Sequence, residues 1–239
     1  MLEQNKIYLG NCLEVMKDID SKSIDMILCD LPYGTTQNKW DTVIPFNLLW
    51  NEYNRIIKDN GAIVLFGMEP FSSCLRVSNL KQYKYDWIWE KSQARGFLNA
   101  WKQPLRNNET VSVFYKKQCT YNPQITDKPK ENIRPMSNRT KLSDCYGNFK
   151  LDVHKLPADK SMPKTIIKFN NCQEHNHPSE KPADLYKYLI KTYTNEGETV
   201  LDNCCGSGTI KVAKTINRNY IGIEKDQKYY EIAVNREIS

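Results

Sequence analysis

Two short turns in the sequence combine residue types that could do chemistry. The first, Asp30-Leu31-Pro32-Tyr33, brings an acceptor carboxylate, a backbone carbonyl and an aromatic ring into four residues. Pro32 fixes the turn and restricts Leu31 to an extended conformation. Such a turn could present hydrogen-bond acceptors beside a stacking surface. By itself the motif is equally typical of an ordinary turn.

The second turn runs from Asp202 through Gly206-Ser207-Gly208, after an apolar run. Glycines at such a place let a ligand approach bare backbone amides. A dinucleotide fingerprint would need a third glycine where the chain has Lys211, and the Gly-Lys-Ser/Thr of a P-loop is absent. A tight strand-to-helix connection is therefore the alternative interpretation.

Glu224 adds weight to a ligand at this turn. It follows the apolar run 220–223, one strand-helix unit later, where a carboxylate can accept hydrogen bonds from both hydroxyls of a ribose. Its alternative role is that of a helix cap or surface acid. Taken together, the glycine turn and Glu224 predict a cofactor that carries a nucleoside.

The elements that must position these turns alternate between short apolar strands and amphipathic helices. Strands are predicted at 7–9, 24–29, 62–66, 85–89, 111–115, 199–201 and 220–223. Helices are predicted at 13–18, 46–58, 71–79 and 182–193, from the glycine turn to about 216, and from 227 onward. This order predicts an α/β fold with a doubly wound, mostly parallel sheet, whose ligands bind at the carboxyl ends of the strands.

The excess positive charge is concentrated in one segment. The chain has 34 basic and 28 acidic residues, and residues 116–170 contain twelve of the former but only five of the latter. This segment also has five prolines and weak apolar periodicity, so we expect an inserted module. A solvated loop region and a surface that binds a polyanion are equally compatible with this composition.

The composition narrows the class of protein. Its 239 residues, 40% hydrophobic and 26% charged, are typical of a globular domain that buries a core, and no apolar run is long enough to span a membrane. The N-terminal residues do not have a signal-peptide pattern, so a cytoplasmic location is expected. The eight scattered cysteines are then expected to be reduced thiols.

At this point the sequence resembles a known family. The turn Asp30-Leu31-Pro32-Tyr33, then His177-Pro178-Ser179-Glu180-Lys181-Pro182, then the glycine turn resemble in content and order the β-class amino-group DNA methyltransferases, which use S-adenosyl-L-methionine. The resemblance spans residues 7 to about 233 and is weakest in the basic segment. It implies a Rossmann-like class I methyltransferase fold with permuted motifs, divided into a catalytic half (1–115), a target-recognition insertion (116–170) and a cofactor half (171–239).

The resemblance also implies roles for individual residues. Asp202, Gly206 and Gly208 would hold the methionine part of the cofactor, and Glu224 would hold its ribose. The turn at Asn11 and Cys12 would contact the adenine edge. The whole implied cofactor set is Asn11, Cys12, Asp30, His177, Ser179, Lys181, Asp202, Cys204, Gly206, Gly208 and Glu224, and the implied catalytic set is Asp30, Leu31, Pro32 and Tyr33.

Several positions depart from the family pattern. Asn11 stands where the family usually has an aspartate, and an amide oxygen can still accept a hydrogen bond there. Asn203 and Cys204 replace the usual Pro-Phe, which leaves the packing of that turn open. Leu31 replaces a proline, but the role implied for this position uses only its backbone carbonyl.

The implied reaction is methyl transfer to an exocyclic amino nitrogen, whose lone pair is delocalised into its ring. Asp30 and the Leu31 carbonyl would accept its two hydrogens, and the base would be flipped out of double-stranded DNA and stacked on Tyr33. In the basic segment, Lys128, Lys130, Arg134 and Arg139 are the predicted phosphate contacts. Arg95 and Arg106, and the aromatic residues Trp87, Trp89, Phe97 and Trp101, are further candidates for DNA contacts, although Trp87 and Trp89 suit a strand core better.

Other interpretations compete with adenine methylation. N4-cytosine methylation needs the same acceptors, and Asp30, where many cytosine enzymes have serine, favours adenine. A protein or RNA methyltransferase and a non-enzymatic DNA-binding protein are more distant alternatives. Cys172, His175 and His177 do not have a standard zinc spacing, so no metal is expected. A homodimer and a partner restriction nuclease are both left open.

Overall fold

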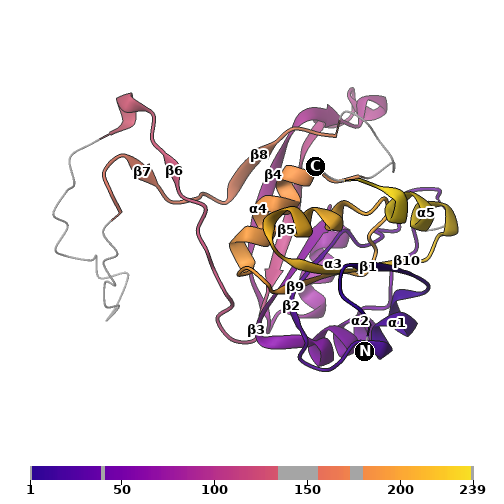
Figure 1. Cartoon of the computed structure of the whole chain (residues 1–239). Helices are drawn as coiled ribbons and strands as arrows, with labels where there is room; N and C mark the ends of the chain where they lie inside the picture. Colours follow the sequence, from indigo (N-terminus) through magenta and orange to yellow (C-terminus); the bar gives the residue numbers. More distant parts are fainter. Residues whose placement is uncertain (1, 39–40, 134–155, 173–179, 238–239) are drawn as a thin grey trace. The chain divides into compact units, whose positions relative to one another are not determined.

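The computed structural model describes residues 2–38, 41–133, 156–172 and 180–237 (Figure 1). The chain divides into a larger unit, 1–122 with 165–239, and a smaller unit, 123–164. The larger unit contains an eight-stranded sheet in the order β1-β10-β9-β2-β3-β5-β4-β8. Neighbours from β1 to β3 are parallel, β5 is antiparallel to both β3 and β4, and β8 is parallel to β4. The predicted mostly parallel α/β sheet is confirmed.

Most of the predicted helices and strands are present, but the helix predicted from the glycine turn to about 216 is a 3-10 helix, η5 (Thr209–Ile216). The strands of the large sheet are β1 (Lys6–Leu9), β2 (Ile24–Cys29), β3 (Ile57–Gly67), β4 (Tyr83–Arg95), β5 (Arg106–Phe114), β8 (Ile166–Phe169), β9 (Thr199–Asp202) and β10 (Asn219–Glu224). The helices are α1 (Cys12–Val15), α2 (Phe46–Ile56), α3 (Phe71–Ser78), α4 (Ala183–Tyr193) and α5 (Gln227–Asn235), with 3-10 turns η1 (Met16–Asp18), η2 (Phe97–Asn99), η3 (Lys130–Asn132) and η5 (Thr209–Ile216).

Alternate residues of the central strands face two separate cores. In β2, Met26 and Leu28 pack with residues of α4, η5 and α5, whereas Ile27 and Cys29 pack with residues of α1, α2 and α3. Every residue of β2 is buried, as expected for a strand covered on both faces. The fold is therefore doubly wound, and Figure 1 shows the helices around the sheet.

The smaller unit, residues 123–164, is shorter than the basic segment predicted at 116–170. It contains η3 and a two-stranded antiparallel sheet of β6 (Thr126–Asp127) and β7 (Lys160–Ser161). Residues 166–169 instead form β8, which pairs with β4 in the large sheet. The sequence pattern does not indicate this strand, because only Ile167 of it is buried.

The sequence predicts neither a membrane-spanning segment nor disulfide bonds. Among the described residues, no helix is long and apolar enough to cross a membrane. The seven cysteines in the described part of the chain are all free thiols, and four of them are buried: Cys12, Cys29, Cys119 and Cys205.

Candidate active site

The chemistry-bearing turns meet at one edge of the sheet. Asp30 directly follows β2, Asp202 ends β9, and Glu224 ends β10. These three strands are parallel and lie next to one another, so their carboxyl ends are adjacent. The connection from β2 leads to β3 on one side, and that from β9 leads to β10 on the other. The β9-β2 junction is thus a topological switch point, where ligands of doubly wound sheets bind.

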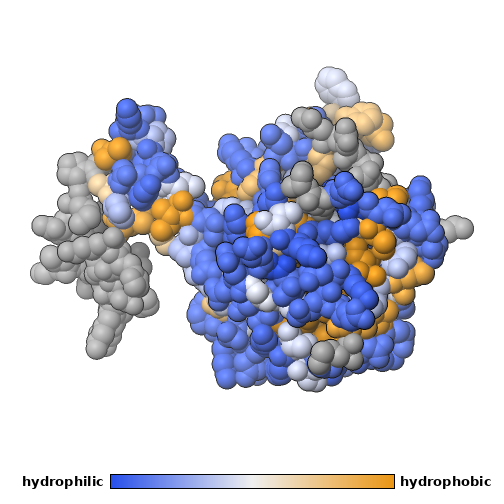
Figure 2. All heavy atoms as spheres, in the orientation of Figure 1, coloured by the Kyte–Doolittle hydropathy of each residue, from blue (hydrophilic) through white to orange (hydrophobic). Residues whose placement is uncertain are grey.

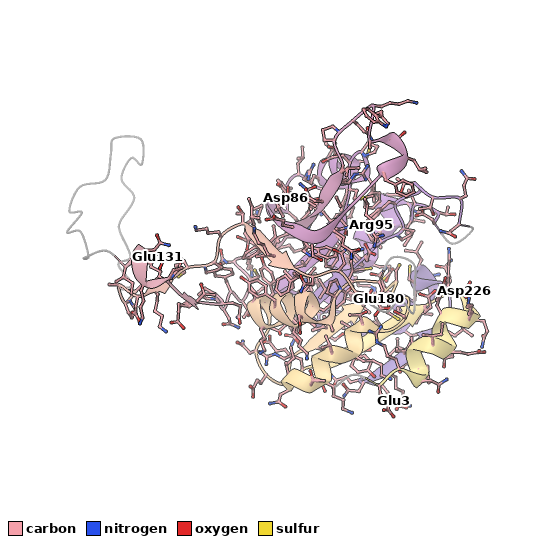
Figure 3. The ribbon with its side chains drawn as sticks, turned by 90° about the horizontal axis from the view of Figure 1, so that it is seen from above. Glu3, Asp86, Arg95, Glu131, Glu180 and Asp226 are labelled. Carbon is pink, nitrogen blue, oxygen red and sulfur yellow. The ribbon has the colours of Figure 1, made fainter. Side chains whose placement is uncertain are left out.

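A single cavity of about 860 Å³ opens at this edge. This volume is in the range of sites for cofactors and drug-sized ligands. Asp30, Tyr33 and Glu224 line it, as do Asn11, Cys12 and residues 203–207 of the glycine turn. The predicted cofactor residues Asp202 and Gly208 are not part of its lining. Arg95 and Glu180, labelled in Figure 3, also line this cavity. The two turns singled out in the sequence therefore share one site.

Asp30 is held from both sides by hydrogen-bond donors. The Tyr33 hydroxyl donates to Asp30 Oδ1 at 2.5 Å, and Lys181 Nζ donates to Oδ2 at 2.5 Å. The Tyr33 ring packs on Phe71 with centroids 4.9 Å apart, which fixes its orientation. Because each carboxylate oxygen has two lone pairs, Asp30 can still accept hydrogen bonds from a substrate.

Glu109 extends this cluster into a buried network of alternating charges. Its Oε2 lies 3.4 Å from Lys181 Nζ, and its Oε1 accepts from Lys91 Nζ. The side chains of Lys181 and Glu109 are only 6% and 7% exposed. Two ammonium groups and two carboxylates thus balance, as burial of charge requires.

The pKa shifts follow from this network. Burial would lower the pKa of Lys181, but the Asp30 and Glu109 carboxylates outweigh it and raise that pKa above its ordinary value. Burial raises the pKa of Asp30, and Lys181 opposes this shift. Burial and the Asp30 charge also raise the pKa of Tyr33, which therefore remains a protonated donor. Lys181 is consequently a cation beside Asp30 at neutral pH.

The glycine turn is fixed by its own acid and by the packing of α5. Asp202 accepts from the Cys204 amide at 3.2 Å and from the Tyr186 hydroxyl at 3.1 Å, and burial raises its pKa to about 7. Gly208 has a φ of 82°, and an added Cβ would lie 2.9 Å from Ala233 Cβ in α5. Packing against α5 therefore requires glycine at position 208. The sequence predicted a different reason, the close approach of a ligand. Gly206, by contrast, lines the cavity.

Glu224 is already engaged by backbone amides. Its Oε2 accepts from the Gly206 amide at 2.9 Å and its Oε1 from the Asp226 amide at 2.8 Å. Burial raises its pKa, and these amide hydrogen bonds oppose the shift. The carboxylate thus ties β10 to the glycine turn and keeps lone pairs for a ligand in the cavity.

The turn after β1 completes this side of the cavity. Asn11 caps α1, with its side-chain oxygen accepting from the Leu13 amide at 3.0 Å. The Cys12 and Cys204 thiols are close enough to hydrogen bond to each other, and together with burial this interaction raises the pKa of Cys12. Where the family usually has Pro-Phe, Asn203 is buried and accepts from the Tyr53 hydroxyl at 2.6 Å. These thiols and this amide fill the turn with neutral groups.

Other predicted site residues lie elsewhere in the chain. His177 and Ser179 fall outside the described residues, as do Arg134 and Arg139. Lys128 and Lys130 belong to the smaller unit, where Lys128 Nζ donates to the Ala158 carbonyl at 2.9 Å. In the described part of the chain, no group of three or more His, Cys, Asp or Glu residues is arranged to hold a metal ion.

Sequence reasoning missed three residues of the site. Glu109 and Lys91 lie in β5 and β4, and Asp41 accepts from the amides of Gly34, Thr35 and Thr36 at 2.7 to 2.9 Å, which fixes the loop after Tyr33. Glu109 could have been found from the sequence, because it is an acidic residue just before the strand predicted at 111–115. Lys91 and Asp41 have no comparable signal.

The fold and this site are those expected of an amino-group methyltransferase of the α/β class, with the Asp30 turn ahead of the glycine turn in the chain. The chain belongs to the DNA methylase family, which it matches over residues 24–235. It is 27% identical over 250 residues to the type II methyltransferase M.HpaI of Haemophilus parainfluenzae, covering 97% of this chain and 73% of that protein. It is 25% identical over 255 residues to the DNA adenine methyltransferase YhdJ of Escherichia coli, covering 98% and 83%.

Solved structures share the fold. The crystal structure of the M1.HpyAVI-SAM complex matches with a TM-score of 0.63 and 22% identity, covering 95% of this chain and 97% of that one. The PvuII DNA methyltransferase, described as cytosine-N4-specific, matches with a TM-score of 0.67 and 15% identity, covering 100% and 89%. The expected class I methyltransferase fold is thereby confirmed.

Proposed function

We propose that this protein is a site-specific DNA methyltransferase that moves the methyl group of S-adenosyl-L-methionine to the N6 amino group of an adenine flipped out of duplex DNA. One observation carries the proposal: the Asp30 carboxylate opens into the same cavity as the glycine turn and Glu224. A hydrogen-bond acceptor for an amino group and a candidate binding site for a nucleoside therefore line the same cavity. Membership of the DNA methylase family supports the same reaction.

The residues of the cavity fit S-adenosyl-L-methionine, which supplies a methyl group carried on a sulfonium. Glu224 has lone pairs left for ribose hydroxyls, and the Gly206 and Ser207 backbone leaves room at the turn. Asn11 and Cys12 line the wall where the adenine edge would lie.

Asp30 and the Leu31 carbonyl activate the target amino group. By accepting its two N–H bonds they withdraw the nitrogen lone pair from the ring and direct it along the line of transfer. Lys181 and Tyr33 hold the Asp30 carboxylate in place, so that little reorganisation is needed when the base arrives. Pro32 fixes the turn that presents the Leu31 carbonyl.

The basic segment supplies the sequence-independent part of DNA binding. Lys128 and Lys130, with Arg134 and Arg139, would contact backbone phosphates while neighbouring residues read bases. The target-recognition role of 116–170 rests on this charge and on its position between the two halves of the enzyme. We also expect the protein to work in the cytoplasm, and a homodimer and a partner restriction nuclease are both left open.

Asp30 favours adenine over cytosine, and the similarity to a relative named as an adenine methyltransferase supports that choice. N4-cytosine methylation is the alternative, because the same two acceptors suit that amino group.

Two measurements test the proposal. Calorimetry should detect S-adenosyl-L-methionine binding, which a purely DNA-binding protein would not show. Methylation-sensitive sequencing of DNA from cells expressing the chain should reveal one modified sequence motif. No cofactor binding and no modified motif would overturn the proposal.

A further inference from the structure

Strands β4 and β5 extend past the edge of the sheet as a hairpin beside the active-site cavity. Every residue from 92 to 108 is exposed, although both strands begin or end in the core. Arg95 pairs with Arg106 across the hairpin, and both side chains line the cavity that contains Asp30. The hairpin therefore leads from the catalytic cluster to solvent.

The tip of this hairpin carries three large apolar side chains that contact little of the protein. Phe97 is 78% exposed, Leu98 83% and Trp101 102%. In Figure 2 apolar residues are visible at this end of the hairpin, at the top of the larger unit. Large apolar groups placed together in solvent at the mouth of a site indicate a binding surface.

The tip is a folded turn, and the charged residues next to it in the hairpin are all cations. Gly96 enters it with a φ of 95°, and amides of Asn99, Ala100 and Lys102 donate within it. The exposed segment 92–108 contains Arg95, Lys102 and Arg106 but no acidic residue. A membrane or protein surface could also receive apolar groups, but three exposed cations without an acid beside the active-site cavity match a polyanion that contains stacked rings.

We propose that this hairpin tip, residues 97–101, inserts into the DNA base stack at the target site and fills the space that the flipped base leaves. Trp101 and Phe97 stack on the bases that border the gap, and the flanking cations contact the phosphates. This inference rests on the proposed function. Stacking on the bases beside the gap offsets the free energy that is needed to flip the target base out of the duplex. The tip therefore affects base flipping and not cofactor binding.

The test compares the double variant Phe97→Ala/Trp101→Ala with wild type on a duplex that carries the motif found by sequencing. We expect kcat/KM to fall by about 10-fold or more, since each base-aromatic stack contributes substantially to binding. The loss should largely disappear when the target base lies opposite an abasic site, where little pairing remains to be broken. Cofactor affinity and Tm should not change.

A matched control is Val77→Ala/Leu80→Ala, which removes two apolar side chains that are 68% and 63% exposed outside the cavity lining. It should behave like wild type. Equal kcat/KM for wild type and the tip variant would overturn the proposal, as would a loss that the abasic duplex does not restore. A tip variant that keeps full activity but changes mass by light scattering would assign the tip to protein contacts instead. Failure of the wild type to methylate any DNA would contradict the proposed function itself.

Discussion

At the scale of single residues, Asp30 is the group on which the proposed methyl transfer depends. Its two oxygens already hold donors from Tyr33 and Lys181, which means that the structure aims the carboxylate before any substrate binds. Replacing Asp30 with alanine should lower kcat by roughly 100-fold or more, as removal of a preorganised electrostatic interaction does. Affinity for S-adenosyl-L-methionine should change little. A tritiated-methyl assay and calorimetry measure the two effects.

The exposed acid Asp59 provides the control, because Asp59→Ala removes a carboxylate remote from the cavity lining. Near-normal turnover of Asp30→Ala would remove Asp30 from the catalytic role.

Glu109 acts through Lys181 and is therefore a positioning residue. Changing it to glutamine removes a charge that raises the pKa of Lys181, so Lys181 should lose its proton at lower pH. We expect kcat to fall about 10-fold, as a small displacement of reacting groups does, and the alkaline limb of its pH profile to move to lower pH. Glu109→Asp should restore part of the profile.

The control for this change is Glu90→Gln, which alters the neighbouring, more exposed acid that pairs with Lys168. An unchanged pH profile in Glu109→Gln, with only a lower Tm, would reduce Glu109 to a structural role.

Asp202 should make stability depend on pH in the direction opposite to most acids. Burial raises its pKa to about 7, above the unfolded value, so between these values the folded state binds more protons than the unfolded state. The free energy of unfolding must then decrease as pH rises toward 7. Asp202→Asn, which cannot ionise, should flatten the decline in Tm between pH 5 and pH 8 relative to wild type.

Asp59 again serves as the control, since its pKa is lowered to about 2 by Lys22 and Lys117. Any Tm difference between Asp59→Asn and wild type should stay constant over the same pH range. Parallel pH curves for wild type and Asp202→Asn would show that Asp202 does not titrate there.

At the scale of elements, the smaller unit and its basic segment should set the salt dependence of DNA binding. Changing Lys128, Lys130, Arg134 and Arg139 to glutamine should weaken binding to all duplexes and lower the slope of log K against log salt by about 0.9 for each phosphate that is no longer neutralised. Fluorescence anisotropy over a salt series measures this slope. Lys6→Gln/Lys17→Gln, which removes two exposed cations elsewhere, is the control. An unaltered slope would leave the segment a solvated loop.

The elements that the sequence predicts well are those with strong periodicity. The run 24–29 is β2 to the residue, and the helix predicted at 71–79 is α3, Phe71–Ser78. Elements without a buried face were missed or cut short. β4 was predicted to end at Trp89 but continues to Arg95, because its last residues are exposed and give no alternation to detect.

The site could be predicted in part for a similar reason. Asp30 and Glu224 end strands, so parallel pairing brings them to one cavity. Lys181 was implied as a cofactor-binding residue, yet its nitrogen lies against Asp30. That interaction depends on how α4 packs over β2 and β9, and no local sequence pattern encodes such a distance.

At the scale of the whole molecule, one cavity at the switch point of the sheet is lined by Asp30, an acceptor for an amino group, and by Glu224, a candidate ribose ligand. The β4–β5 hairpin, which has exposed cations and an apolar tip, lies beside this cavity. These features together fit the proposed enzyme, which takes a base out of a duplex and methylates it. The central claim concerns which atom receives the methyl group.

Nucleoside analysis of DNA after reaction with S-adenosyl-L-methionine carrying a deuterated methyl group tests this claim most directly. Wild-type protein should yield deuterated N6-methyladenine, and Asp30→Ala should yield almost none. N4-methylcytosine in place of N6-methyladenine would contradict the adenine assignment while leaving the fold and the role of Asp30 intact. The absence of any deuterated nucleoside would contradict the proposed function as a whole.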